Sequence, residues 1–254
     1  MSSNIGEKNE SLGMFAGFVL LSEDHWDKQQ FLDDLHEEWE IDLEEDDDTN
    51  PNVVVANYED NRVVIAKFSS TIPNNEAEKN ASNNYMWENA VEVTKTHKAH
   101  LFVSVLGETA DLIEKGKRYV KLLAACCKQR EAIGVYTCGV VFEPKIYETF
   151  AAIMRDGYLP IFNWIWFGLY KSAEGVTAYT YGMDVFGKPE MEVVDAQGTP
   201  SDIRGFLANI VEYVIENDVT LRHGETIEFS ENDSHKIAYS EGVSLPGQMT
   251  LKIT

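Results

Sequence analysis

Apolar residues recur along the chain at two spacings, one typical of β-strands and one typical of α-helices. Short runs of apolar and β-branched residues predict strands, and they fall at residues 14–21, 53–58, 62–68, 99–106, 133–142, 161–170, 176–181, 226–229, 236–239 and 249–253. Apolar residues three and four positions apart predict helices, and they fall at residues 24–39, 84–98, 109–127, 144–156 and 201–217. The polar stretches 44–48 and 69–83 show neither spacing, so we expect exposed loops there.

The helix expected at residues 201–217 has the strongest signal. Its apolar residues recur at helical offsets along its whole length. Thr199, Pro200 and Asp202 supply an N-cap residue, a proline at the first helical position and an acid at the third. We therefore expect an amphipathic helix that begins within this segment.

The order of these elements predicts an α+β fold with an internal duplication. Residues 1–107 follow the order β-α-β-β-α-β, residues 108–130 form a connecting helix, and residues 131–254 repeat the order with an additional C-terminal hairpin. This order is typical of a split β-α-β unit, in which helices cover one face of an antiparallel sheet. We therefore expect two tandem ferredoxin-like halves.

Composition and charge narrow the classes of function. With 44% hydrophobic residues the chain has an ordinary globular composition, but 43 acidic and 21 basic residues give it a formal net charge of −22. A field of that sign repels phosphate groups and anionic lipids, so we expect no direct binding to nucleic acid or to a membrane surface. The apolar runs are much shorter than the ~20 residues of a membrane helix, and the polar N-terminus does not resemble a signal peptide.

The cysteines indicate the compartment. Cys126 and Cys127 are adjacent, and Cys138 makes the number odd, so the three cannot all pair within the chain. We expect reduced thiols in a cytoplasmic protein.

One short motif matches a catalytic signature. Arg222-His223-Gly224-Glu225 has the letters that surround the phosphoryl-accepting histidine of histidine phosphatases. In that family the motif follows the first strand of a large α/β domain, whereas only 29 residues follow Glu225 here. We therefore interpret the motif as a turn.

Other kinds of site are not supported either. The acidic residues at 44–50 lack the glycine and the glutamate of a calcium loop, and His97 and His100 have no cysteine near them that could complete a zinc site. The chain has no glycine-rich phosphate loop and no nucleophile elbow. Cys138 lies in a predicted strand without a basic neighbour, so we expect a buried structural thiol. We assign no catalytic residue, no metal site and no cofactor.

Aromatic residues give the strongest candidates for binding. Alternation puts Trp164, Trp166 and Tyr170 on one face of the strand expected at 161–170, and the facing strand adds Tyr179 and Tyr181. Exposed rings of this number mark an interface or a ligand groove, whereas buried rings would pack the two halves together. Both interpretations stay open, and these five residues are the candidates for contact with a ligand or a partner.

Several segments resemble a bacterial family known as domain-of-unknown-function family 4261. They are the opening 17–21, the hairpin 164–181, the helix 201–217, and the tail segments 224–227, 240–242 and 250–253. The family has no residues of assigned role. The resemblance implies a bacterial cytoplasmic protein and implies nothing about mechanism.

Two hypotheses of function follow. The first is a non-enzymatic acidic module, for example an immunity-type protein that neutralises a toxin, because an acidic surface attracts a basic protein partner. The second is a small-molecule sensor or enzyme that uses an aromatic groove between the two halves, with Asp184 or Glu143 as its acid. We prefer the first because no catalytic constellation occurs in the sequence.

Overall fold

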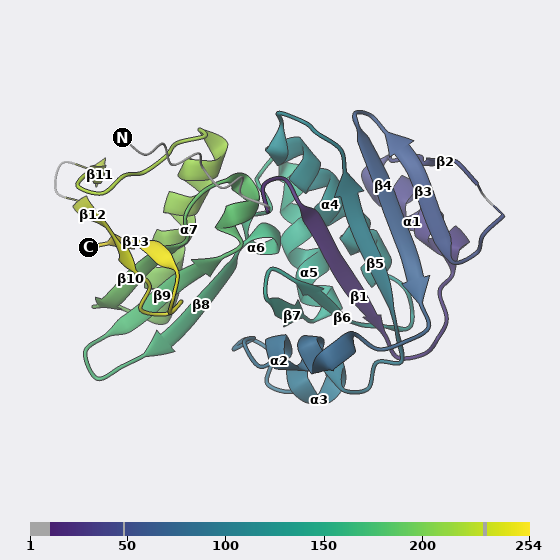
Figure 1. The fold of residues 1–254 in the computed structure, drawn as a ribbon, viewed down its shortest axis with the longest axis horizontal. Helices are drawn as coiled ribbons and strands as arrows, with labels where there is room; N and C mark the ends of the chain where they lie inside the picture. Colours follow the sequence, from purple (N-terminus) through teal and green to yellow (C-terminus); the bar gives the residue numbers. More distant parts are fainter. Residues whose placement is uncertain (1–10, 48, 231–232) are drawn as a thin grey trace, which may run out of the picture.

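The computed structural model describes residues 11–47, 49–230 and 233–254. Its strands form two sheets that lie side by side, with helices packed against both (Figure 1). The prediction of a mixed α+β fold is therefore confirmed. Buried side chains from both sheets belong to one large hydrophobic cluster, so the sheets share a core.

In the described residues the first sheet contains seven strands, and all neighbouring pairs are antiparallel. In spatial order they are β2 (Glu44–Glu45), β3 (Val53–Tyr58), β4 (Asn61–Phe68), β5 (Ala99–Leu106), β1 (Phe15–Leu21), β6 (Ala132–Thr137) and β7 (Val140–Phe142). Side chains alternate between the faces of a strand. In β1, Val19 and Leu21 enter the main core, while Leu20 packs on the opposite face. Both faces of this sheet are therefore buried around β1.

Helices cover both faces of the first sheet. α1 (Lys28–Trp39), α4 (Leu112–Cys127) and α5 (Pro144–Ala151) pack into the main core, whereas α2 (Glu76–Ala81) and α3 (Ala90–Thr94) lie on the opposite face beside β6 and β7. The expectation that helices cover only one face is therefore wrong for this sheet.

The stretch 69–83, expected to be one exposed loop, supplies part of this second layer. Ile72, Ala77 and Ala81 are buried there and pack against the same cluster as Leu20. Alanine side chains are short, so the helix sits close to the sheet without the large apolar residues that reveal a helix in a sequence. The helix expected at 84–98 is also shorter than predicted, because only α3 is α-helical in that range.

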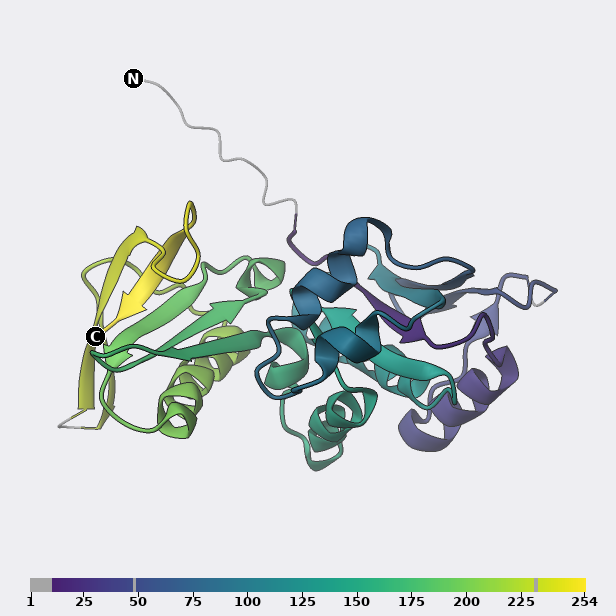
Figure 2. The ribbon, with the colours of Figure 1, turned by 90° about the horizontal axis from the view of Figure 1, so that it is seen from below.

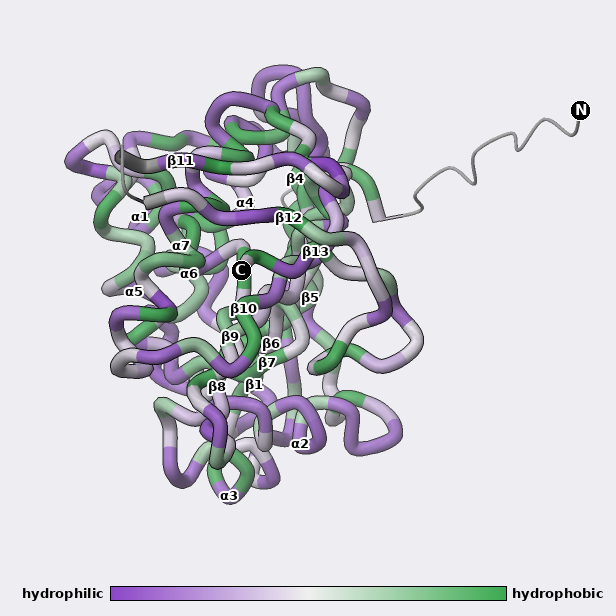
Figure 3. Tube along the Cα trace, turned by 90° about the vertical axis from the view of Figure 1, so that its left-hand side faces the viewer, coloured by the Kyte–Doolittle hydropathy of each residue, from purple (hydrophilic) through white to green (hydrophobic). Residues whose placement is uncertain are grey.

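Six strands of the described ranges form the second sheet. In spatial order they are β11 (Thr226–Ser230), β12 (Asp233–Glu241), β13 (Met249–Ile253), β10 (Met191–Ala196), β9 (Val176–Tyr181) and β8 (Trp166–Lys171). The pairs are antiparallel except β10 with β13, which is parallel. Figure 3 shows that β12 is largely hydrophilic, as is typical of a strand near an exposed sheet edge. The sequence pattern missed β10, since Glu192 and Asp195 interrupt its apolar residues.

α7 (Pro200–Glu216) packs across β8, β9 and β10. Its N-terminus forms the predicted capping box, because the Thr199 hydroxyl accepts a hydrogen bond from the amide of Asp202 at 3.2 Å and the Asp202 carboxylate accepts one from the amide of Thr199 at 3.3 Å. Both orphan donors at the helix start are thereby satisfied. Short 3₁₀ segments occur at Pro73–Asn75, Ala152–Asp156 and Met183–Phe186.

The segment 161–170, expected to be one strand, changes from helix to strand in its middle. α6 (Ile161–Trp164) is a short helical segment that follows Pro160, and β8 begins at Trp166. The Asn163 side chain donates Nδ2 to the carbonyl oxygen of Tyr147 at 2.9 Å, which ties this turn to α5. A short apolar run is compatible with a buried helical turn or with a buried strand, and the sequence pattern did not distinguish the two.

The strand order does not confirm two tandem ferredoxin-like halves. In a split β-α-β unit the first strand lies between the third and the fourth, whereas β1 here lies between β5 and β6. β6 and β7, expected in the half formed by residues 131–254, pair with the first sheet instead. The boundary between the sheets thus falls between Phe142 and Trp166 rather than at the connector 108–130. The order of elements along a chain does not specify which strands pair, and this pairing is decided by the tertiary structure.

Candidate functional site

Four of the five aromatic candidates, Trp166, Tyr170, Tyr179 and Tyr181, share one face of the β8–β9 hairpin, but their exposure differs. Trp164 and Trp166 are buried, with 5% and 4% of their surface exposed, whereas Tyr170 and Tyr181 are each 41% exposed and Tyr179 is partly buried. Trp166 and Tyr181 are direct partners in the β8–β9 register, so they share a face of the sheet as predicted. Trp164 belongs to α6 and is therefore not part of this hairpin face.

The two tryptophans pack the second sheet against the first. The ring of Trp166 meets Phe142 of β7 edge-on, with centroids 5.7 Å apart. Trp164 contacts Phe186, with centroids 5.2 Å apart, and it lies so close to α4 that a Cβ atom at Gly116 would be 2.9 Å from its ring. These contacts are core packing between the sheets.

Tyr170 and Tyr179 lie on the same face of the hairpin as Trp166. Tyr179 covers Gly168, where a Cβ atom would be 2.1 Å from the tyrosine ring. The Tyr170 hydroxyl lies 3.4 Å from the Ser244 hydroxyl. Neither tyrosine is among the described residues that line the cavity at Trp164.

Trp164 and Tyr181 instead line a cavity of about 250 Å³ between the sheets. Its apolar and aromatic walls come from β1 and the residue before it, α4, α6, β9 and the 3₁₀ segment 183–186. They are Met14, Phe15, Ala16, Tyr119, Trp164, Tyr181, Val185 and Phe186. Its polar lining is Ser11, Thr137, Cys138, Asn163 and Asp184. Of the two acids suggested by the sequence, Asp184 therefore lies at the cavity, while Glu143 is exposed at the start of α5.

Buried polar atoms at this cavity lack partners. Asn163 has no exposed surface. Its Nδ2 donates to the Tyr147 carbonyl, but its Oδ1 accepts no hydrogen bond from the described residues. The indole Nε1 of Trp164 is likewise buried and without an acceptor in the described chain. A buried polar group without a partner costs about 1–3 kcal/mol, so these two atoms lower the stability of the junction between the sheets.

Burial shifts the pKa of two groups that line the cavity. Burial raises the pKa of the Cys138 thiol, and the nearby Glu190 raises it further. Burial also raises the pKa of Tyr181, with a further contribution from Asp184. The Cys138 thiol is therefore protonated near neutral pH, and a protonated thiol is a poor nucleophile. Cys138 lies in the turn between β6 and β7 and is partly exposed, so the expectation of a buried thiol inside a strand is wrong.

Glu190 stands behind the cavity wall. Its carboxylate accepts hydrogen bonds from the amides of Gly182 and Met183, at 2.7 and 3.0 Å, and from the Thr180 hydroxyl at 2.5 Å. Burial outweighs these bonds and raises the pKa of Glu190 to about 7. The carboxyl fixes the turn after β9, which carries Tyr181 into the cavity.

One region of the chain matches a known protein family. Residues 179–254 match the family model described as Domain of unknown function (DUF4261). The chain carries a DUF4261 domain. No curated protein and no solved structure matches the chain.

The DUF4261 domain comprises the end of β9, β10, α7 and the C-terminal strands β11 to β13. Tyr179 and Tyr181 lie within it, whereas Trp164, Trp166 and Tyr170 precede it. The opening 17–21, which the sequence analysis also compared with this family, lies outside the matched region and belongs to β1 of the first sheet.

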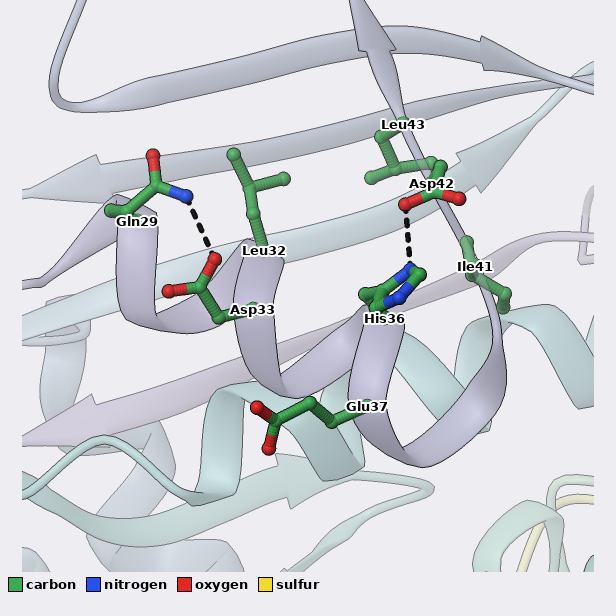
Figure 4. A pocket seen from close by; sticks show the side chains of 8 residues that line it. All are labelled: Gln29, Leu32, Asp33, His36, Glu37, Ile41, Asp42 and Leu43. Atoms are coloured by element: carbon green, nitrogen blue, oxygen red, sulfur yellow. Dashed lines mark hydrogen bonds and ion pairs between the residues drawn. The ribbon is translucent and has the colours of Figure 1, made fainter.

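A second hollow lies on α1, which packs against the first sheet and is outside the DUF4261 domain. It measures about 350 Å³. Apolar residues from α1 and the following segment line it, namely Leu32, Ile41 and Leu43, together with Gln29, Asp33, His36, Glu37 and Asp42. Figure 4 shows Leu32 between two hydrogen-bonded pairs, Gln29 with Asp33 and His36 with Asp42, each 2.8 Å apart.

The segment Arg222–Glu225, which matched a phosphatase motif, forms a turn. Glu225 accepts a hydrogen bond from the Arg222 amide at 2.8 Å, and His223 Nδ1 accepts one from the Tyr239 amide at 3.0 Å, so this segment closes a turn.

Within residues 11–47, 49–230 and 233–254, no group of three or more His, Cys, Asp or Glu side chains is placed to hold a metal ion. No helix in these ranges is long and apolar enough to span a membrane.

Proposed function

We propose that this protein is a non-enzymatic acidic module that binds a basic protein partner in the bacterial cytoplasm. An immunity-type role, in which the partner is a toxin and binding blocks its activity, is the concrete form of this proposal. The observation that carries it is the hollow on α1, where acidic side chains surround an apolar floor.

The negative charge of the chain is concentrated around that hollow. Residues 23–48 contain fourteen Asp and Glu residues and one Lys. They form α1 and the segment that leads to β2 at the edge of the first sheet. Figures 1 and 2 show that this edge lies at the opposite end of the molecule from the second sheet. A partner is therefore attracted to one end of the molecule rather than to its whole surface.

The acids at the hollow are available to a partner. Asp33 and Glu37 are exposed, and in the described chain no lysine or arginine forms an ion pair with either. Asp42 is 80% exposed at its side chain, and its ion-pair partner among the described residues is the exposed His36. The neighbouring Glu38, in contrast, is neutralised by Lys128 and Arg155.

The chemistry of the hollow suits a lysine or arginine side chain. Such a side chain has an apolar stem and a charged head. Leu32 and Leu43 offer an apolar surface for the stem, and Asp33 and Asp42 offer carboxylates for the head. A basic protein that inserts one such residue gains specificity from the hollow and speed of association from the surrounding field.

The test is affinity capture from native lysate of the source organism with two matched triple variants. Asp33→Asn/Glu37→Gln/Asp42→Asn removes three charges at the hollow. Glu88→Gln/Glu174→Gln/Glu216→Gln removes three exposed charges elsewhere. We expect the wild-type protein and the control to capture the same basic protein at low salt, and we expect the hollow variant to capture about tenfold less. The amount is measured by quantitative mass spectrometry.

Two results would overturn the proposal. Either no basic protein is captured, or the hollow variant and the control capture it equally. The immunity-type role requires a further result. The purified partner must lose its activity when the wild-type protein is added in equimolar amount.

A specific observation also favours the second hypothesis, small-molecule binding. Trp164 and Tyr181, two of the five aromatic candidates, line the cavity between the sheets. Tyr170 and Tyr179 do not line it, and Trp166 packs beside it, so the ligand site would be smaller than the predicted groove.

A further inference from the structure

We propose that His97 and His100 form an acid-sensitive switch that holds the α2–α3 layer on the first sheet while both rings are neutral. The α2–α3 layer is residues 69–96, which cover the face of the sheet around Leu20. Protonation of the two rings releases this layer. The switch is separate from the hollow on α1 and does not depend on a partner there.

His97 is hydrogen-bonded through both ring nitrogens as a neutral imidazole. The residue is buried, with 3% of its surface exposed. Nε2 accepts a hydrogen bond from the Ile72 amide at 2.9 Å, so this nitrogen carries no proton. Nδ1 lies 2.6 Å from the carbonyl oxygen of Thr94, which can only accept, so Nδ1 carries the proton. A second proton on Nε2 would face the N–H of Ile72 and break this hydrogen bond.

His100 holds the start of the segment that leads into α2. Its Nδ1 donates to the carbonyl oxygen of Ser70 at 2.8 Å. Its ring is stacked on Phe68, with centroids 5.2 Å apart, and meets Phe18 edge-on at 5.6 Å. Burial lowers the pKa of His100 by more than the hydrogen bond to Ser70 raises it, and the nearby His97 lowers it further.

The charged groups around the rings do not accommodate the additional protons. Oε1 of Glu78 in α2 lies 3.9 Å from His97 Nδ1. This nitrogen already carries a proton, so Glu78 offers no acceptor to Nε2 on the other side of the ring. Glu92 of α3 forms no ion pair with either ring among the described residues. The other charged or titratable groups on these elements have partners of their own, namely Lys67 with Asp24, Lys98 with Glu23, and Tyr136 with Glu76.

Small side chains attach the layer to the sheet. Its cluster of buried residues in the described chain is Leu20, Ile72, Ala77, Ala81, Ala90 and Val141, and three of these six are alanines. Hydrogen bonds from Asn83 to the Gly139 carbonyl oxygen and from Asn84 to the Val141 carbonyl oxygen, at 3.0 and 2.8 Å, add to these contacts. Segments that bury little apolar surface open at a lower free energy than the main core.

Acid therefore favours the open layer. The lowered pKa of His100 means that the closed layer favours the neutral ring. The contribution of His100 to holding the layer is full above pH 6.5 and is lost as the pH falls below that value. His97 acts in the same direction, because a second proton on its ring and the hydrogen bond from Ile72 exclude each other.

Opening of the layer changes two surfaces. It uncovers Leu20 and Val141, which have no exposed surface in the closed state. It also separates Tyr85, which lies between α2 and α3, from Trp166 of the second sheet, where the ring centroids are 5.0 Å apart. The switch thus controls access to an apolar face of the first sheet and the contact of the layer with the second sheet.

Hydrogen–deuterium exchange of the full chain at pH 7.5, 6.5 and 5.5 tests the switch. Exchange is detected by peptide mass spectrometry and corrected for the intrinsic pH dependence of amide exchange. We expect peptides from residues 70–96 to lose protection by at least about tenfold between pH 7.5 and 5.5, since pH 5.5 lies one unit below the ordinary pKa of histidine of about 6.5. Peptides from α4 and α7 should keep their protection.

A non-titrating variant isolates the two histidines. His97→Gln/His100→Asn supplies a side-chain oxygen that can accept from Ile72 and a side-chain amide that can donate to Ser70. We expect this variant to show equal protection of residues 70–96 at pH 7.5 and 5.5. The matched control His25→Gln/His223→Gln replaces two exposed histidines outside the layer and should respond to acid like the wild type.

The wild-type protein supplies a second test that does not require the double variant to fold. Its histidine ¹H–¹⁵N spectrum at pH 7.5 should show His97 as the tautomer that is protonated at Nδ1 alone. The proposal is overturned if acid leaves residues 70–96 protected, if α4 and α7 lose protection equally, if His97→Gln/His100→Asn keeps the wild-type response, or if His97 is protonated at both nitrogens at pH 7.5.

Discussion

Two glutamates, two residues apart, show how local surroundings set the charge of a buried carboxyl. Burial raises the pKa of Glu190 to about 7. Burial also disfavours the charged form of Glu192, but hydrogen bonds from Lys252, Ser244, Val243 and Thr250 outweigh it and lower the pKa of Glu192 to about 2. The Lys252 ammonium lies 2.5 Å from the Glu192 carboxylate. The same residue type therefore has opposite effects on stability as the pH changes.

The two carboxyls should act in separate pH ranges. A pKa raised from 4.5 to about 7 means that the folded state holds the Glu190 proton more tightly, so this contribution to stability is full below pH 4.5 and is lost as the pH rises through 7. A pKa lowered to about 2 means that the contribution of Glu192 is present above pH 4.5 and is lost as the pH falls through 2. Each effect is on the order of 3 kcal/mol at about 1.4 kcal/mol per pKa unit.

Urea unfolding of Glu190→Gln and Glu192→Gln at a series of pH values that spans both pKa values tests these two contributions to stability. Glu190→Gln should flatten the loss of stability between pH 4.5 and 7 seen in the wild type. Glu192→Gln should flatten the loss at acidic pH, and it should also be less stable at neutral pH by about 3–5 kcal/mol because Lys252 loses its buried partner. Identical pH profiles for the two variants would contradict these pKa values.

At the level of elements, the sequence predicted α7 correctly and did not predict α6. α7 has a full amphipathic period, a proline at its start and a capping box, and all three appear in the sequence. α6 is a single short segment in an apolar run, and its conformation depends on packing against α5. Local signals determine long helices well, and short buried segments are determined by their neighbours.

The capping box of α7 can be tested directly. Thr199→Ala removes the side-chain acceptor for the Asp202 amide, and we expect the free energy of unfolding to fall by about 1 kcal/mol. Thr199→Ser keeps the hydroxyl and should stay within a few tenths of a kcal/mol of the wild type. Chemical denaturation measures both, and an unchanged stability of Thr199→Ala would show that the cap contributes nothing.

At the level of the whole molecule, the two sheets are joined by aromatic packing. Trp164 and Trp166 contact residues of the first sheet and its helices, and the buried residues of both sheets form one cluster. The DUF4261 domain includes most of the second sheet but leaves out β8 and the two tryptophans at the junction. The matched region thus depends on preceding residues to complete its core.

The shared core predicts cooperative unfolding of the two sheets. Far-ultraviolet circular dichroism and tryptophan fluorescence should give coincident denaturation curves. Trp164→Ala should lower the free energy of unfolding by about 3–5 kcal/mol, whereas Trp164→Phe should have a much smaller effect. Two separated transitions would show that the sheets fold as independent units.

The sequence by itself determined the α+β class, most strands, the position and cap of α7, and the concentration of acids at residues 23–48, because these follow from local periodicity, capping chemistry and composition. It also selected Trp164 and Tyr181, since clustered aromatic rings are visible in a sequence. The tertiary structure decided the strand order, the second helical layer and the cavity. Asn163 and Asp184 meet Trp164 there only because strands and helices distant in the chain pack together, and local pattern carries no information about such long-range pairing.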